Sequence, residues 1–274
     1  MDIYYINSIN EKVYLDRYPY RMLSVTGLFN YEYKYEKKRN NTVKNIKKDM
    51  RTAPVSIDIS GKSFSEYYEN VVKLYEIIDY DAVTRTPGRL YVGEYYLECY
   101  FYKSEKHNKY INVKHSTVSF SVVTNKVNWV REITQMFRNN YNFIVQEGAD
   151  LDYPHGYPHD YMPPLPVVNN SSFYPSEFIL RIYGHVVNPS INIGEHDYTV
   201  YTTLETGDYL TIDSRRGKIY KTKVDGEVEN QFKYRDRESY IFEPIPRGIS
   251  TILWDGYFGF DLTVFDERGE PKWS

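Results

Sequence analysis

The sequence predicts a mainly β protein with two domains, on the strength of three observations. Its 274 residues are enough for one large domain or two of ordinary size. Short apolar runs bounded by turn residues recur along most of the chain, as is typical of strands. Tyrosine is abundant, with 31 Tyr against 13 Phe and 3 Trp. Tyrosine favours strands and interfaces, because its ring packs on a pleated surface while its hydroxyl stays hydrated.

A proline-rich segment is expected to divide the chain. Five prolines lie within residues 150–166. Proline fixes φ and removes a backbone donor, so neither a helix nor a central strand can run through this segment. It therefore predicts a semi-rigid connector. We expect an N-terminal domain over residues 1–150, a linker over 151–166 and a C-terminal domain over 167–274.

The N-terminal part is expected to combine strands with one helix near residues 63–79. Ser63 and Glu66 have the spacing of a capping box. Apolar residues then follow at intervals of three and four, which predicts one buried helix face of about four turns: Phe64, Tyr67, Val71, Leu74 and Ile78. Strands are expected over residues 12–15, 24–35, 55–59, 89–103 and 110–125, with inward-facing side chains at Val118, Phe120 and Val122.

The C-terminal part is expected to contain strands only. Candidate strands lie over residues 176–183, 190–193, 198–204, 209–213, 218–223, 239–242, 250–254 and 257–265. Turn dipeptides such as Arg216-Gly217 and Asp225-Gly226 separate several of them. Many short strands at this spacing predict a β-sandwich or jelly roll.

Charge and cysteine content argue against several classes of protein. The net charge of −3 and the pI of about 6.1 provide no overall basic field for nucleic acid or an anionic membrane. Cys99 is the single cysteine, so no intrachain disulfide is possible, and we expect a buried thiol in a protein that folds in a reducing cytoplasm. Neither a signal peptide nor a membrane span is expected.

No catalytic, cofactor or metal site is predicted. The sequence contains no nucleophile elbow, P-loop or paired cysteine motif. His155 and His159 are four residues apart, but Gly156 and Pro158 between them exclude a shared helix face. A metal site there would need Asp152 or Asp160 and a fixed loop, and exposed linker side chains are the simpler interpretation.

A basic segment over residues 34–51 is the strongest local charge feature. Its candidate partner-contact residues are Lys37, Lys38, Arg39, Lys44, Lys47 and Lys48. They could meet an acidic partner or DNA phosphates, but a solvated hairpin or loop is the favoured interpretation. Nearby aromatic residues alternate, which indicates one face of a sheet rather than a base-stacking platform: Phe29, Tyr31, Tyr33 and Tyr35.

Several segments resemble the distal tail proteins (Dit) of siphophages. Residues 86–97, which follow the expected helix, are similar to the N-terminal domain of that family, and residues 152–161 are similar to its connector. Residues 198–201, 207–213, 252–261 and 268–273 resemble its C-terminal half. The resemblance covers nearly the whole chain, whereas residues 37–51 are its least family-like part.

The resemblance implies a structural protein of the phage tail tip, assembled in the host cytoplasm. An N-terminal β-sandwich with one helix would form a homo-hexameric ring between the tail tube protein and the tail-associated hub or fibre protein. DNA would pass through the channel without specific binding. A C-terminal galectin-like β-sandwich or jelly roll would project outward and could carry receptor-binding proteins. The alternative is a carbohydrate-binding module that recognises a host cell-wall saccharide. A cell-wall hydrolase is disfavoured, because no catalytic pattern is present.

Overall fold

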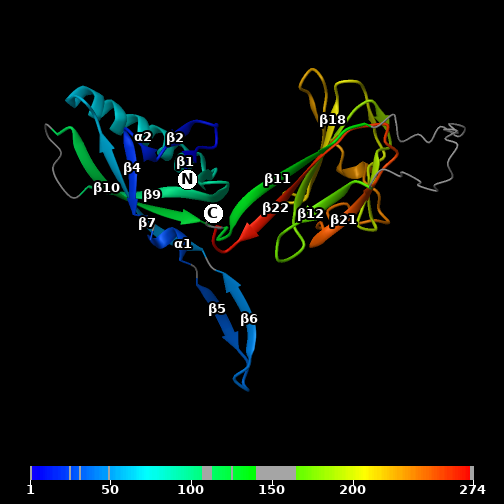
Figure 1. Cartoon of the computed structure of the whole chain (residues 1–274), viewed down its shortest axis with the longest axis horizontal. Coiled ribbons are helices and arrows are strands. Elements are labelled where there is room, and N and C mark those ends of the chain that lie inside the picture. Colours follow the sequence, from blue (N-terminus) through cyan, green and yellow to red (C-terminus); the bar gives the residue numbers. More distant parts are fainter. Residues whose placement is uncertain are drawn as a thin grey trace, which may run out of the picture. The chain divides into compact units, whose positions relative to one another are not determined.

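The computed structural model describes residues 2–24, 26–30, 32–48, 50–106, 113–124, 126–139 and 165–271. It divides into two compact units (Figure 1). Unit 1 comprises Met1–Arg131 and Glu267–Ser274, and unit 2 comprises Glu132–Asp266. Antiparallel strands dominate both units, as expected for a mainly β protein. In the described part of the chain, no helix has the length and apolar character that a membrane span requires.

Unit 1 is built on a curled antiparallel sheet. The long strand β9 pairs with β10 through one part of its length and with β8 through the other, so the sheet bends around a shared core. The strands are β1 (Ile3–Ile6), β2 (Lys12–Tyr14), β3 (Asp16–Arg17), β4 (Tyr20–Ser24), β7 (Arg51–Ser60), β8 (Gly88–Val92), β9 (Tyr95–Lys106) and β10 (His115–Thr124). A separate pair, β5 (Tyr33–Lys37) and β6 (Val43–Lys48), forms a two-stranded sheet of its own.

Helix α2 (Phe64–Thr84) packs on this sheet against β7 and β9. Ser63 caps it by accepting a hydrogen bond from the Glu66 backbone N–H at 3.1 Å, as predicted. The helix extends five residues beyond the expected end at residue 79 and stops at Arg85, whose φ is 57°. The expected buried face is confirmed at Tyr67, Leu74 and Ile78, and Val71 packs against it half-buried. Phe64 was wrongly placed in the core. It is 44% exposed, because it begins the helix before the helix reaches the sheet.

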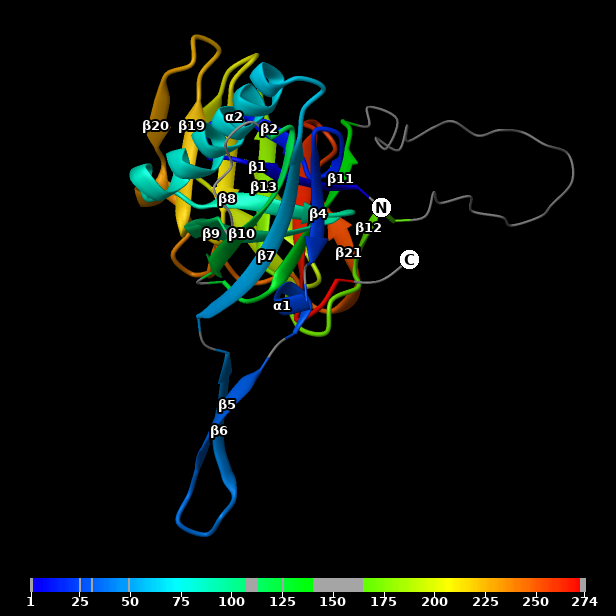
Figure 2. The same cartoon turned by 90° about the vertical axis from the view of Figure 1, so that its left-hand side faces the viewer.

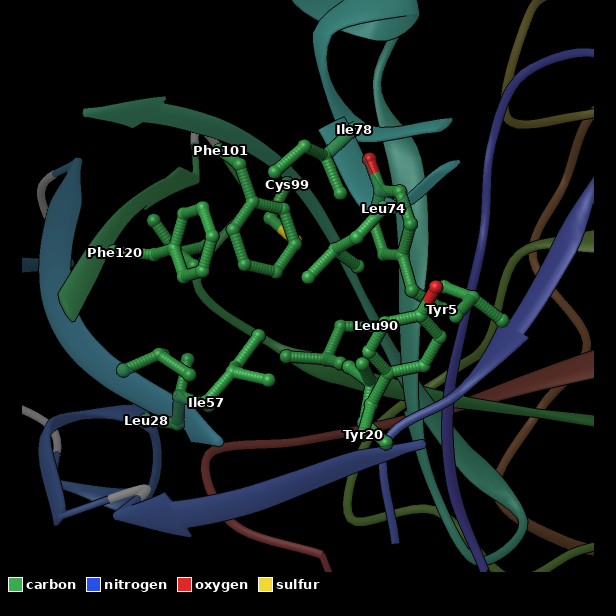
Figure 3. Packing of buried hydrophobic residues seen from close by; sticks show 14 of the residues in the cluster. Tyr5, Tyr20, Leu28, Ile57, Leu74, Ile78, Leu90, Cys99, Phe101 and Phe120 are labelled. Carbon is green, nitrogen blue, oxygen red and sulfur yellow. The ribbon is translucent and has the colours of Figure 1, made fainter. Parts of the chain in front are cut away.

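The core of unit 1 is mainly aliphatic, with several large aromatic side chains among the aliphatic ones. Figure 3 shows Leu74 and Ile78 of α2 among Leu90, Cys99 and Phe101 of the sheet. The predicted inward residues of β10 are all buried: Val118, Phe120 and Val122. Cys99 is fully buried, as expected, and burial raises the pKa of its thiol well above the ordinary range.

A buried polar pair joins β1 to the end of α2. Asp81 accepts one hydrogen bond from the Tyr5 hydroxyl at 2.5 Å and another from the Ser8 backbone N–H at 2.8 Å. Both Tyr5 and Asp81 are fully buried, and burial raises the pKa of Tyr5 above its ordinary value. A Cβ at position 88 would lie 2.2 Å from the Tyr5 hydroxyl and 2.3 Å from a carboxylate oxygen of Asp81. Gly88 is therefore required for this close approach.

Residues 24–35 do not form the single strand that their alternation predicted. Instead β4 ends at Ser24, the one-turn helix α1 (Thr26–Phe29) follows, and β5 begins at Tyr33. Phe29 is half-buried and stacks on Trp129 with ring centroids 5.5 Å apart. It therefore does not share a sheet face with Tyr33 and Tyr35, because α1 interrupts the alternation. Tyr31 lies outside the described residues.

Unit 2 is a β-sandwich with its core between two layers, as predicted for the C-terminal part. One layer has the order β20-β19-β18-β13-β22-β11 and the other β12-β21-β15-β16. The bounds are β11 (Trp129–Phe137), β12 (Val167–Asn170), β13 (Phe178–Tyr183), β15 (Ser190–Ile193), β16 (His196–Thr199), β18 (Tyr209–Asp213), β19 (Lys218–Thr222), β20 (Val228–Asn230), β21 (Gly248–Leu253) and β22 (Phe260–Arg268). Smaller elements are the pair β14 (Val186–Val187) and β17 (Thr203–Leu204), and the 3-10 turn η2 (Phe232–Tyr234).

The two units differ from the expected domains at two places. Residues 132–139 belong to unit 2 rather than to the N-terminal domain, and residues 267–271 belong to unit 1. Strands β11 and β22 each contribute residues to both units. Phe137 of β11 stacks on Phe260 in unit 2, with centroids 4.7 Å apart. Of the expected linker over 151–166, only residues 165 and 166 are described, and His155 and His159 lie outside the described residues.

Candidate assembly surfaces

The basic segment folds as a hairpin that projects beyond the end of β7 (Figures 1 and 2). Every residue of β5 is exposed. Tyr33 pairs with Lys48, Tyr35 with Ile46 and, after a bulge, Lys37 with Val43. The hairpin joins no other strand of the described sheets. A lone two-stranded hairpin is marginally stable in water, so this arrangement favours a protein partner.

The two faces of the hairpin differ in character. Directly paired residues lie on the same face, and side chains alternate along each strand. One face therefore carries Lys37, the register partner of Val43, and four large apolar side chains between 46% and 58% exposed: Tyr33, Tyr35, Val43 and Ile46. The other face is polar, with Lys34, Glu36 and Asn45. Exposed apolar groups rimmed by charge mark interaction sites.

All six predicted contact residues lie on this hairpin or its turn. Lys37, Lys44, Lys47 and Lys48 belong to the strands, and Lys38 and Arg39 belong to the turn. Lys44 lies 3.8 Å from Glu36, an exposed pair that contributes little to stability. The structure brings the predicted cations together on one projecting element.

The chain that enters and leaves the hairpin surrounds a cavity of about 450 Å³. Arg51 crosses its edge and donates hydrogen bonds from its two terminal nitrogens to the carbonyls of Leu28 and Asn30. Its Nε is buried and has no hydrogen-bond partner among the described residues. Burial lowers the pKa of the guanidinium. Arg51, the first residue of β7, therefore joins β7 to α1 at the base of the hairpin.

The outward face of α2 is apolar and acidic. Residues three or four apart share a helix face, and those opposite the buried residues are Ser65, Tyr68, Glu69, Val72, Glu76, Asp79, Tyr80 and Val83. Tyr68, Val72, Tyr80 and Val83 are exposed, and Val83 reaches 80%. Lys73, exposed at the edge of this set, is the single basic residue of the helix, against Glu69, Glu76 and Asp79 on the face itself. We call this set the α2 outer face.

A row of tyrosines crosses four neighbouring strands of unit 1, from Tyr14, which is exposed, to Tyr96, which is buried. Tyr14, Tyr4, Tyr91 and Tyr96 are register partners on β2, β1, β8 and β9. Their ring centroids are 5.8, 4.5 and 5.3 Å apart in that order. Cations lie over these rings at 3.7 to 4.6 Å: Lys12, Arg17 and Arg89. The sequence did not predict this row, because its members become neighbours only through strand pairing.

Unit 2 carries an aromatic cluster around η2. Phe232 and Tyr240 lie on either side of Phe242, with centroids 6.1 and 6.0 Å away. The Tyr201 backbone N–H donates to the Tyr234 carbonyl at 2.8 Å, so Tyr201 lies beside η2. All except Phe242 are exposed. The sequence provided only scattered aromatics here, so the cluster was not predicted.

One serine and histidine pair in unit 2 has the spacing of a nucleophile and its base. Ser239 Oγ lies 3.1 Å from His196 Nε2. However, Ser239 donates its proton to the Asp197 carbonyl at 2.6 Å, and His196 Nε2 lies 3.0 Å from the Tyr240 carbonyl. A ring nitrogen that donates to a carbonyl carries a proton and cannot act as a base. This pair therefore fastens the 239–240 segment to β16. Among the described residues, no three His, Cys, Asp or Glu side chains form a metal-ligand cluster.

Comparison with known proteins identifies the fold. No family model matches the chain, and no curated protein matches it. Solved structures match over almost its entire length. The baseplate of phage P2 in its activated conformation with Ca has a TM-score of 0.66 at 11% identity, covering 98% of this chain and 99% of that chain. The same baseplate with Sr has a TM-score of 0.67 at 10% identity with the same coverage.

A third structure is the Dit protein of phage SPP1, described as a paradigm of the hub adsorption apparatus in phages that infect Gram-positive bacteria. It has a TM-score of 0.61 at 8% identity and covers 97% of this chain and 99% of that chain. This chain has the Dit fold. The match includes both units of this chain, since it extends over nearly the whole of each chain compared.

Proposed function

We propose that this protein is a structural component of a phage tail tip that forms a hexameric ring at the end of the tail tube. The ring would link the tail tube protein to the tail-associated hub or fibre protein, and receptor-binding proteins could attach to unit 2. DNA would pass through the channel without specific binding. The protein would be assembled in the host cytoplasm and reside in the virion.

The observation that carries this proposal is the full-length match to baseplate and Dit structures. The described surfaces support it independently. The exposed hairpin and the α2 outer face give unit 1 two apolar surfaces that are accompanied by charge. Such surfaces are typical of proteins that work through contacts.

The oligomeric state tests the proposal. Light scattering of the purified full-length chain should give a mass near six times 32.6 kDa, and negative-stain images should show rings with a central hole. Increasing protein concentration should favour the ring by mass action. A chain that stays monomeric at every concentration, or that forms open filaments, would contradict the ring.

We further propose that the protein acts without catalysis. In the pair formed by Ser239 and His196, which has catalytic spacing, both side chains are bonded to backbone carbonyls. Purified protein should therefore release no soluble fragments from host peptidoglycan. Release of fragments that is lost when a single Asp or Glu is replaced would overturn this proposal.

A second candidate function is saccharide binding by unit 2. The aromatic cluster around η2 favours it, because Phe232, Tyr234 and Tyr240 are exposed, and apolar sugar faces can pack on aromatic rings. Calorimetry with purified wall polysaccharide tests this candidate. Binding that Tyr240→Ala abolishes would support it, whereas equal binding by the variant would argue against this surface.

A further inference from the structure

We propose that the β5–β6 hairpin of one copy lies on the α2 outer face of the next copy. This inference rests on the proposed ring and names the surfaces that close it. Each copy would offer its hairpin on one side and its helix on the other. Such a contact joins two different surfaces, which is the arrangement that a closed ring requires.

Within the part of the chain that the structure describes, no other strand covers the apolar side chains of the hairpin. Its four large apolar side chains are exposed on one face, and its strands join no other described strand. Figures 1 and 2 both show the hairpin and α2 at opposite ends of unit 1. The Arg51 bonds to the Leu28 and Asn30 carbonyls further restrict the hairpin base. The α2 outer face of a second copy can therefore cover the hairpin, whereas α2 of the same copy lies at the other end of unit 1.

Charge selects α2 as the complementary surface. The hairpin carries exposed cations beside its apolar face, including Lys37, Lys38 and Lys44. The α2 outer face carries Glu69, Glu76 and Asp79, against which Lys73 at its edge is the single basic residue of the helix. Opposite charges at the rim of an apolar contact favour the correct pairing and penalise like-charged alternatives.

The tyrosine row is a weaker match for the hairpin. Cations already lie over its rings, with Lys12 3.7 Å from the Tyr4 centroid and Arg17 4.2 Å from the Tyr14 centroid. A basic hairpin placed there would bring cation against cation. The α2 outer face avoids that repulsion.

The two surfaces also match in length and in apolar content. A five-residue strand such as β5 spans about 17 Å at its usual rise. The helix from Tyr68 to Val83 spans about 22 Å. Each surface exposes four large apolar side chains along that length. Covering both sets removes apolar area from water, which drives association, while the charges set the orientation.

Charge reversal in the full-length chain tests the contact. Glu76→Lys with Asp79→Lys, or Lys37→Glu with Lys38→Glu, should each raise the dissociation constant between copies about tenfold or more at low salt. The quadruple variant restores opposite charges and should recover to within about threefold of wild type. Glu238→Lys, an exposed reversal in unit 2, is the matched control and should leave assembly unchanged.

Crosslinking between single-cysteine variants tests the same contact without altering charge. Chains with Tyr35→Cys are mixed with chains carrying Val72→Cys and treated with a short bis-maleimide. The natural Cys99 stays in place, because it is fully buried. Crosslinked pairs should form between the two variants, and the double variant should give a ladder of higher oligomers. A mixture of Tyr35→Cys and Val224→Cys chains is the control, since Val224 is exposed in unit 2.

The outcomes separate this contact from the proposed function. Rings that persist in both reversed variants, with crosslinks no more frequent than in the control, would overturn the hairpin contact and leave the ring intact. A wild-type chain that never assembles would overturn both. Reversed variants that fail to assemble, while the quadruple variant also fails, would contradict the charge pairing.

Discussion

Replacement of Leu74 by alanine provides the sharpest test of the unit 1 core. Leu74 is fully buried on α2 (0% exposed), and Figure 3 shows it among the surrounding aliphatic and aromatic side chains. The change removes three carbon atoms, which at ~0.8 kcal/mol each account for ~2.4 kcal/mol of lost burial. The cavity adds to this loss, because a dense core closes only partly. The free energy of unfolding should therefore fall by about 3–5 kcal/mol.

Urea denaturation can measure this loss in unit 1 alone. Trp254→Phe and Trp273→Phe leave Trp129, which is fully buried in unit 1, as the only tryptophan. Its fluorescence then reports unit 1 even if unit 2 unfolds separately. Val83→Ala, on the same helix at an exposed site, is the control and should change stability by less than about 0.5 kcal/mol. A Leu74→Ala cost below about 1 kcal/mol, or one equal to the control, would refute the assigned packing.

Three further predictions concern the polar and shared parts of the fold. Tyr5→Phe should reduce the stability of unit 1 by about 1–3 kcal/mol in urea denaturation, because it leaves the buried Asp81 carboxylate with one donor fewer. Lys221 donates to Asp208 at 3.0 Å and lowers the pKa of that carboxyl. A depressed folded pKa gives stability that is present above the unfolded value, near 3.9, and is lost as pH falls through the folded value. The melting temperature of unit 2 should therefore fall as the pH is lowered below about 5, and it should fall less steeply in Asp208→Asn. An equal dependence of the melting temperature on pH in both proteins would contradict the pairing. Phe137→Ala should lower the melting temperature of unit 2 and leave that of unit 1 unchanged. A lower melting temperature of unit 1 alone would show that this part of β11 does not belong to unit 2.

Local signals in the sequence predicted α2 well. The Ser63 cap and the three-and-four spacing place Tyr67, Leu74 and Ile78 in the core, as the structure confirms. Such signals depend on neighbours along the chain, so they can be read directly from the sequence. Phe64 fits the same spacing but lies outside the core, because spacing does not reveal where the helix first meets the sheet.

Features that depend on strand pairing were harder to predict. Strand β11 was not recognised, because Trp129 and Val130 are buried together and only then does an alternation of half-buried and exposed residues begin. Residues 132–139 therefore belong to unit 2, although the proline-rich segment that was expected to divide the domains lies further along the chain. The tyrosine row has the same origin, since Tyr4 and Tyr91 meet only through the register of β1 and β8.

The local structure of the basic segment was predicted in part, and its role in partner contacts stays a prediction. The basic residues were recognised, and a hairpin was one of the structures expected for them. Two properties could not be read from composition. The bulge between Glu36 and Lys37 determines which cations accompany the apolar face. The α2 outer face becomes apparent only after the buried face has been assigned.

The buried bond between Tyr5 and Asp81 has a consequence for folding fidelity. Strand β1 carries Tyr4 and Tyr5 in succession, and β9 carries Tyr95 and Tyr96. A slip by one residue turns every side chain of a strand to the opposite face. Here that slip would exchange one tyrosine for another, so apolar patterning alone penalises it weakly. Only Tyr5 in its native register reaches Asp81 beside Gly88, and a misaligned strand would leave that carboxylate buried without its donor. The pair thus distinguishes the correct register from its nearest competitor.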